Sequence, residues 1–180
     1  MTTYIGLLRA VNLGGYNRIG MADLREFLTR LGLQDVKTLL QSGNFVGRSD
    51  VRSSSELERL VEGAAAKQLG LTTDVLVRSD TEWKTLIAKN PFPKEAKLDP
   101  SHLLAVVLKA APDSASVKTL EQAITGREIV NVQGRCAYIV YPDGIGRSRL
   151  TSAVIDNKLR TRGTARNWNT VLKLAALASG

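Results

Sequence analysis

The sequence predicts a mixed α+β protein made of two ferredoxin-like lobes, each a split β-α-β unit. Its 180 residues suffice for one ordinary domain or two small ones. The apolar fraction of 43% and the charged fraction of 23% are close to globular averages, which excludes general disorder. Strand and helix patterns follow the same order in both halves, which share no obvious residue identity. Split β-α-β units form a four-stranded antiparallel sheet with two helices on one face, so we expect a duplicated ferredoxin-like fold.

The amino-terminal lobe, residues 1–80, shows the order strand, helix, strand, strand, helix, strand. Apolar side chains at three- and four-residue spacing predict two amphipathic helices, and Ser55 with Glu58 has the spacing of a capping box for the second. The dipeptide Ser42-Gly43 predicts a hairpin turn. The expected strands are 4–11, 36–41, 44–48 and 73–78, and the expected helices are 21–31 and 55–69.

The carboxy-terminal lobe, residues 81–180, repeats this order after a linker helix and a proline-rich segment. The helix starts near Asp80 and breaks at Asn90-Pro91, and residues 90–100 are the best candidate linker. A later helix is expected to begin with Asp113 or Ser114 as its cap. The expected strands are 103–108, 128–132 and 136–141, and the expected helices are 114–126, 150–159 and a terminal one over 168–178.

Positive charge is concentrated in the second half of the chain. Residues 1–80 contain ten Lys/Arg and nine Asp/Glu, whereas residues 81–180 contain fifteen and eight. From residue 145 onward there are seven basic residues and one acid, Asp156. Such a surface attracts phosphate-bearing partners before any specific contact forms. The alternative is that the basic surface only keeps the protein soluble.

Several function classes are disfavoured by what the chain contains. The single cysteine, Cys136, cannot form an internal disulfide, which favours a reducing cytoplasm. No apolar run approaches the ~18 residues of a membrane span, so we expect no membrane partner. With one cysteine and one histidine, His102, the sequence offers no metal cluster and no catalytic triad. We therefore expect no metal and no cofactor. Nine aromatic residues are too few to predict a base-stacking platform.

Several motifs resemble an uncharacterised bacterial family known as domain of unknown function 1697. They run through the chain in the family's order from residue 4 to about residue 174, and they are Leu7–Gly15, Met21–Arg25, Gln41–Asn44, Asn90–Pro93, Gly146–Thr151 and Thr164–Val171. Departures from the family pattern are Gly20, Gly47 and Arg160, which affect the ends of local elements. The resemblance implies a two-lobed α+β fold and no catalytic residues.

The first candidate site is an anion-binding loop over residues 144–149. Two glycines allow a ligand to approach the backbone, Ser148 can cap the following helix, and Arg147 with Arg149 would flank the positive helix end. The alternative is a connector with solvated arginines. A second segment, made up of Arg166, Asn167 and Trp168, can join this site by stacking or charge. Alternatively, Trp168 anchors the last helix in the core.

The second candidate site is a polar cluster near the end of the first strand. It consists of Arg9, Asn12, Arg18, Gln41, Ser42 and Asn44. Within strand 4–11, Arg9 would share a face with apolar side chains and therefore need a partner or a ligand. The alternative is internal: Arg9 pairs with Asp23 or Glu26, and Asn44 takes a left-handed turn. Whether the two clusters form one site or two stays open.

These patterns favour a cytoplasmic binding protein for an anionic ligand, either a nucleic-acid backbone or a nucleotide. An enzyme acting on a small phosphorylated or carboxylated substrate is an alternative, in which Arg9, Arg18 and Arg147 would stabilise charge, but no general base is evident. A scaffold or homodimer whose basic face meets an acidic protein is a further alternative. The residues favour binding over catalysis.

Overall fold

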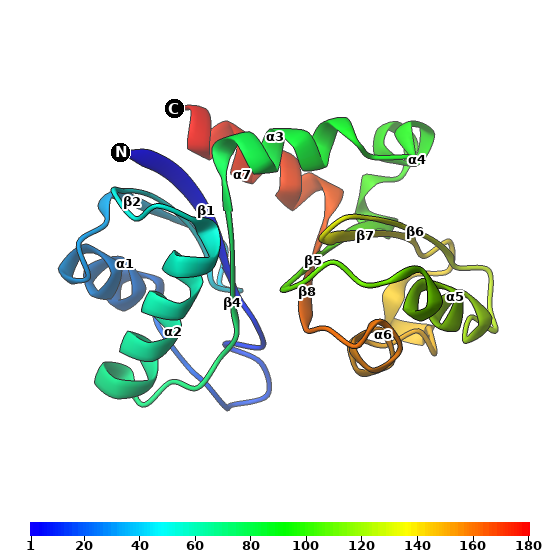
Figure 1. The fold of residues 1–180 in the computed structure, drawn as a ribbon, viewed down its shortest axis with the longest axis horizontal. Coiled ribbons are helices and arrows are strands. Elements are labelled where there is room, and N and C mark those ends of the chain that lie inside the picture. The colour runs from blue at the N-terminus through cyan, green and yellow to red at the C-terminus, as the bar shows by residue number, and fades with distance from the viewer. The chain divides into compact units, whose positions relative to one another are not determined.

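Two four-stranded antiparallel sheets and seven α-helices make up the protein, which is therefore a mixed α+β protein (Figure 1). A computed structural model describes all residues, 1–180. The chain forms two units: unit 1 comprises Met1–Thr85 and Lys173–Gly180, and unit 2 comprises Leu86–Leu172. No helix combines the length and the apolar character needed to cross a membrane.

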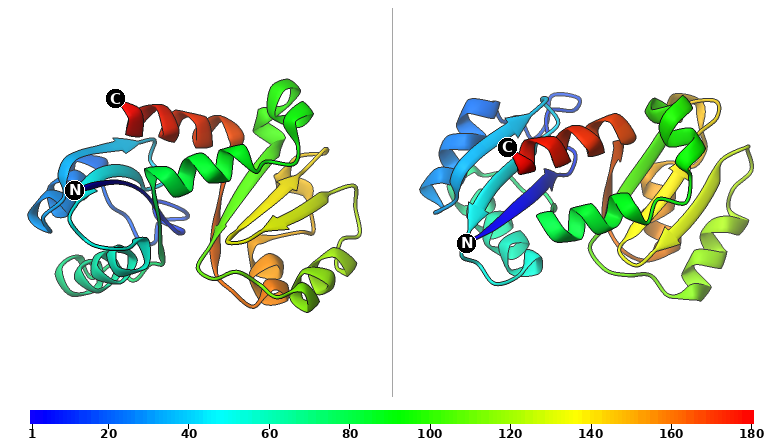
Figure 2. Two further views of the ribbon diagram at one scale, coloured as in Figure 1. Left: turned by 45° about the horizontal axis from the view of Figure 1, so that its top comes forward. Right: turned by 90° about the horizontal axis from the view of Figure 1, so that it is seen from above.

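In unit 1, two helices cover one face of the first sheet, whose strand order is β2-β3-β1-β4 (Figures 1 and 2). Its elements are β1 (Thr2–Leu8), α1 (Met21–Arg30), β2 (Gln34–Leu39), β3 (Asn44–Ser49), α2 (Ser54–Leu69) and β4 (Val75–Ser79). Phe27 of α1 and Leu57 of α2 pack with Tyr4, Leu8 and Phe45 of the strands in one buried cluster. The apolar side chains whose spacing predicted these helices therefore form the core of unit 1, as expected.

Unit 2 contains the second sheet, with strand order β6-β7-β5-β8 and with α5 and α6 on one face (Figures 1 and 2). Leu120 of α5 and Ile155 of α6 pack against Val106 and Ile139 of the strands. The elements after β4 are α3 (Asp80–Ala88), α4 (Pro93–Leu98), the 3₁₀ turn η1 (Pro100–His102), β5 (Leu103–Leu108), α5 (Ser114–Gln122), β6 (Ile129–Gln133), β7 (Cys136–Val140), the 3₁₀ turn η2 (Ile145–Arg147), α6 (Ser152–Leu159), β8 (Gly163–Asn167) and α7 (Trp168–Ser179).

Strand β8 has no counterpart among the strands predicted from the sequence. Its residues, Gly-Thr-Ala-Arg-Asn, lack both alternation and β-branched apolar character, and it forms an edge of the sheet. Gly163 is required there because a Cβ at this position would lie 2.8 Å from the Leu108 side chain and from the Val107 carbonyl oxygen. The strand is held by pairing with the buried strand β5 and not by its own propensity.

The predicted capping box at Ser55 and Glu58 is wrong. Ser53 caps α2 by accepting a hydrogen bond from the backbone N–H of Glu56 at 3.2 Å. The Glu58 carboxylate is buried and accepts instead from the backbone N–H of Val77 at 2.9 Å, while also pairing with Arg78 at 3.4 Å. Three successive serines made the cap position ambiguous, and the helix begins two residues earlier than the box requires.

The two units differ in the lengths of corresponding connections. Between β1 and α1 there are twelve residues, 9–20, whereas five, 109–113, join β5 to α5. Eleven residues, 141–151, join β7 to α6, whereas four, 50–53, join β3 to α2. Each unit therefore has one long connection, and the two lie at different places in the same element order.

Candidate functional sites

The long connection of unit 2 borders a hollow of about 290 Å³. Its lining comes from the α5–β6 connection and the β7–α6 connection. The lining residues are Thr125, Gly126, Glu128, Asp143, Gly144, Arg147, Ser148 and Arg149. The structure therefore brings Arg147, Ser148 and Arg149 to one site.

Both carboxylates of this hollow already have partners. Ser148 Oγ donates a hydrogen bond to Glu128 Oε1 at 2.5 Å. Arg127 binds Asp143 through two N–H groups, one of them Nε to Oδ2 at 3.1 Å. This contact lowers the pKa of the Asp143 carboxyl, and it raises that of the Arg127 guanidinium.

Arg147 and Arg149 are exposed, and neither forms a salt bridge or a side-chain hydrogen bond within the protein. Gly144 beside them has a φ of +81°, a left-handed conformation that side chains other than glycine rarely adopt. The hollow thus presents two guanidinium groups with unused donors, beside the Asp143 carboxylate, which is paired with Arg127, and the Glu128 carboxylate, which is hydrogen-bonded to Ser148. That arrangement can receive an anion.

The expectation that Ser148 caps the following helix is wrong. Helix α6 begins at Ser152, and its cap is Thr151, whose side chain accepts from the Val154 N–H at 3.3 Å. The 3₁₀ turn η2 occupies residues 145–147, so Ser148 lies between this turn and the helix and is too early in the chain to cap it. Its Oγ instead accepts from the Leu150 N–H at 3.0 Å, which holds the connection against β6 through Glu128.

The segment Arg166, Asn167 and Trp168 does not line this hollow. Arg166 donates to Thr164 Oγ1 and to the Ala165 carbonyl, both at 2.9 Å, and burial lowers its pKa to about 10. Asn167 Oδ1 accepts from the Thr170 N–H at the start of α7. Trp168 is 3% exposed, with its ring centroid 6.4 Å from that of Tyr138. Their contacts hold the junction at which β8 ends and α7 begins.

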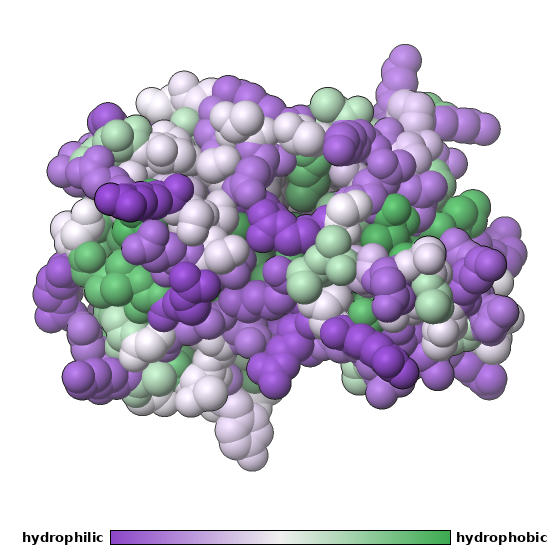
Figure 3. All heavy atoms as spheres, viewed as in Figure 1, coloured by the Kyte–Doolittle hydropathy of each residue, from purple (hydrophilic) through white to green (hydrophobic).

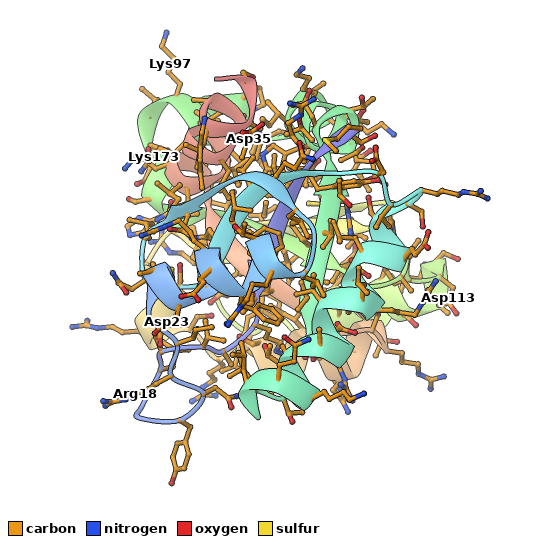
Figure 4. The ribbon with its side chains drawn as sticks, turned by 90° about the vertical axis from the view of Figure 1, so that its left-hand side faces the viewer. Arg18, Asp23, Asp35, Lys97, Asp113 and Lys173 are labelled. Carbon is orange, nitrogen blue, oxygen red and sulfur yellow. The ribbon has the colours of Figure 1, made fainter.

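The long connection of unit 1 borders a larger cleft of about 540 Å³. Three residues of the predicted polar cluster, Asn12, Arg18 and Gln41, lie in its lining. The complete lining is Asn12, Arg18, Ile19, Gly20, Asp23, Glu26, Arg30, Gln41, Leu69 and Leu71. Figure 4 shows Arg18 on the β1–α1 connection and Asp23 at the start of α1 on the same side of unit 1.

The other three members of the predicted cluster, Arg9, Ser42 and Asn44, do not line the cleft. Asn44 is fully buried, and its Nδ2 donates to the Leu39 carbonyl at 2.8 Å and to Ser42 Oγ at 2.9 Å. Asn44 is not in the left-handed conformation of the alternative interpretation; Asn12, with a φ of +58°, and Asn17, with a φ of +48°, have it.

Arg9 follows the end of β1 and pairs with Asp74, with 4.0 Å between Nη1 and Oδ2. The predicted partners Asp23 and Glu26 are therefore wrong, as is the predicted strand face. Alternation stops at Leu8, and Ala10 has a φ of +51°, so Val11 joins the core on the helix side. The strand was predicted to continue to Val11, three residues beyond its end at Leu8, and Arg9 was therefore assigned to the wrong position.

Sequence patterns did not assign the acidic residues to either site, nor the aliphatic residues to the cleft of unit 1. Asp23 and Glu26 are three residues apart on the exposed side of α1, a spacing that was available as a signal. Glu128 and Asp143 are brought together only by the sheet.

No group of three or more histidine, cysteine, aspartate or glutamate side chains is arranged to hold a metal ion. The surface seen in Figure 3 is mostly hydrophilic, with smaller hydrophobic patches in each unit.

The fold and sites define a two-unit α+β protein with one polar hollow beside the long connection of each unit. Residues 1–138 match the model of a family described as "Protein of unknown function (DUF1697)". The chain belongs to this family, which confirms the resemblance seen in its motifs.

A solved structure is similar in fold to this chain. It is described as the conserved bacterial protein SP0830 from Streptococcus pneumoniae, with a TM-score of 0.76 and 20% sequence identity over 98% of each chain. At this identity the likeness shows the fold alone. A comparison with curated proteins found no match.

Proposed function

We propose that the protein binds an anionic, phosphate-bearing ligand, either a nucleic-acid backbone or a nucleotide, at the hollow lined by Arg147 and Arg149. The observation that carries this proposal is that both guanidinium groups are exposed and unpaired while the carboxylates of Glu128 and Asp143 are engaged. An incoming phosphate can accept hydrogen bonds from either arginine without first breaking an ion pair.

The charge distribution supports the same ligand class. Fifteen of the 25 Lys/Arg residues lie in residues 81–180, where there are eight Asp/Glu residues. An excess of positive charge raises the local concentration of phosphate-bearing molecules and the rate at which they associate. Arg166 is half-buried and donates hydrogen bonds to Thr164 and the Ala165 carbonyl, so Arg147 and Arg149 become the main candidates for direct contact.

The proposal is tested by fluorescence anisotropy of labelled single- and double-stranded oligonucleotides and of a labelled adenine nucleotide, at low and at physiological salt. The double variant Arg147→Ala/Arg149→Ala should weaken binding at least about tenfold at physiological salt. On duplex DNA it should also reduce the slope of log affinity against log salt by about 2, one per lost phosphate contact.

The matched control is Lys94→Ala/Lys97→Ala, which removes the same charge from exposed side chains of unit 2. Figure 4 shows the Lys97 side chain extending into solvent. This control should change affinity much less than the arginine double variant. Equal losses in the two double variants would mean that only net charge matters and that the hollow is not the binding site. Binding confined to low salt would refute the proposed function.

For the fold, we propose that both units are copies of one ferredoxin-like, split β-α-β arrangement. Unit 1 and unit 2 have the same element order from their first strand, and their strand orders β2-β3-β1-β4 and β6-β7-β5-β8 correspond position by position. A crystal structure in which the two units superpose strand for strand would support this duplication. A displaced strand or a parallel pair would contradict it.

A further inference from the structure

The cleft of unit 1 has a different chemical character from the arginine hollow of unit 2. Its volume of about 540 Å³ falls in the range of small-molecule sites. Three aliphatic side chains, those of Ile19, Leu69 and Leu71, line it together with charged groups of both signs. A ligand for this cleft must therefore satisfy apolar surface as well as a cation and an anion.

Two of the four charged side chains in the lining compensate each other. Arg30 Nη1 lies 3.6 Å from Glu26 Oε1, one helical turn apart on α1. Arg18 and Asp23 form no salt bridge and no side-chain hydrogen bond. The cleft therefore carries one positive and one negative group whose hydrogen-bonding capacity is unused by the protein.

The Asp23 carboxylate is turned toward the amino-terminal start of α1. Its Oδ2 lies 3.1 Å from the position that a Cβ on Gly20 would occupy. Gly20 thus leaves room for this carboxylate beside the connection that carries Arg18. In Figure 4 the Arg18 side chain extends away from that connection, and both Arg18 and Asp23 belong to the lining of the cleft.

The wall that carries Arg18 is fixed before any ligand arrives. Asn12 Nδ2 donates to the Ile19 carbonyl at 2.9 Å and to the Gln41 carbonyl at 2.6 Å. Asn12 Oδ1 accepts from the Ile19 N–H at 2.9 Å. One side chain therefore ties the β1–α1 connection to the β2–β3 turn, and a site held in this way loses little entropy on binding.

We propose that this cleft binds a small zwitterion of the amino-acid type. The carboxylate of the ligand pairs with Arg18, its ammonium group pairs with Asp23, and its aliphatic part packs against Ile19, Leu69 and Leu71. A simple anion such as inorganic phosphate fits less well, because Asp23 repels it. A simple amine is disfavoured by Arg18 for the same reason.

Titration of the ¹⁵N-labelled full chain with L-leucine, L-isoleucine and L-methionine, followed by NMR, tests the proposal. Shifts should be confined to the residues that line the cleft: the β1–α1 connection, the start of α1, Gln41, and the segment that carries Leu69 and Leu71. Two analogues separate the charges: 4-methylpentanoate lacks the ammonium group of leucine, and 3-methylbutylamine lacks its carboxylate. Each should bind at least about tenfold more weakly than leucine, since each loses a charge-assisted contact.

Variants localise the two contacts. Arg18→Gln should remove the advantage of leucine over 3-methylbutylamine, and Asp23→Asn should remove its advantage over 4-methylpentanoate. Arg59→Gln and Glu56→Gln, exposed changes of the same type on α2 outside the lining, should leave both advantages intact. Thermal melting of every variant shows whether it is folded.

Three results would overturn this inference. One is the absence of localised shifts with all three amino acids at millimolar concentration. Another is equal binding of leucine and its two analogues. The third is unchanged preference in the folded Arg18→Gln and Asp23→Asn variants. None of these results bears on the oligonucleotide assay, because that assay depends on Arg147 and Arg149 in unit 2, so the two proposals can fail separately.

Discussion

Gly6, in the middle of β1, lies directly under the ring of Phe45. The two residues are paired across β1 and β3, and Phe45 is fully buried in the core of unit 1. A Cβ on Gly6 would lie 2.0 Å from Phe45 Cζ and 2.2 Å from Cε1. Carbon atoms in contact are normally separated by about 3.5–4.0 Å. The substitution Gly6→Ala therefore forces the ring to move by about 1.5 Å in a closely packed core.

Overpacking of this kind costs roughly 1–3 kcal/mol. Because the contact falls on the ring carbons and the ring has no exposed side to move into, we expect Gly6→Ala to lower the free energy of unfolding by about 2–3 kcal/mol. The lower backbone entropy of alanine in the unfolded chain offsets at most about 1 kcal/mol of the strain. Urea unfolding followed by far-UV circular dichroism measures the change.

A double-mutant cycle with Phe45→Leu identifies the cause. Phe45→Leu alone should destabilise by leaving space in the core, but in the Gly6→Ala background it removes the overlap and should cost at least about 1 kcal/mol less. Gly63→Ala in α2 is the matched control, since nothing lies within 4 Å of the added Cβ. It should be neutral or stabilising by up to about 1 kcal/mol. Additive effects in the cycle, or a Gly6→Ala variant as stable as the wild type, would refute this reasoning.

Three further predictions concern buried or paired polar groups. Burial raises the pKa of Tyr141 to about 12, so the unfolded chain ionises first, and stability should fall between about pH 10 and 12 by roughly 2–3 kcal/mol. Tyr141→Phe should flatten this fall in urea unfolding at stepped pH. The pKa of Asp143 is lowered by Arg127, so its contribution to stability is present above about pH 4 and is lost as the pH falls through the lowered value. Arg127→Gln should raise the Asp143 pKa measured by NMR, and no rise would show that the pair is absent in solution. Asn44→Ala should cost about 2 kcal/mol, because it removes two partly buried hydrogen bonds, including the one that Asn44 donates to the Leu39 carbonyl.

Apolar spacing was sufficient to predict most helices and strands. Helix α1 follows directly from Leu24, Phe27 and Leu28, which are all buried. Strand β5 is apolar throughout and buried throughout, so its position was also predictable. Strand β8 was not predictable because its place is decided by a partner strand that is distant in sequence. A local sequence pattern indicates which side chains of a segment are buried. It does not indicate a strand such as β8, whose position is set by pairing with β5.

The cleft of unit 1 was partly predictable from strand pairing alone. Because β1 pairs antiparallel with β3, the end of β1 meets the start of β3, which places Asn12 beside Gln41. Which polar side chains would be consumed internally could not be read from the sequence. Arg9 depended on the residue at which β1 ends, and Asn44 depended on the carbonyl of Leu39 being within reach.

Both candidate sites lie beside connections whose lengths differ between the two units. The shared strand order and the helices on one face of each sheet form cores of similar design, in which neither Arg147 nor Arg18 takes part. The twelve-residue connection 9–20 in unit 1 and the eleven-residue connection 141–151 in unit 2 have short counterparts of four or five residues in the other unit. Fold stability alone does not require the extra length, because each short counterpart closes the same step of the same topology. Longer connections on a rigid scaffold are where binding groups are commonly placed. The extra residues therefore support the choice of these two connections as the places where the proposed ligands bind. Shortening one connection to the length of its counterpart should abolish binding in that unit and leave the other unit's binding intact.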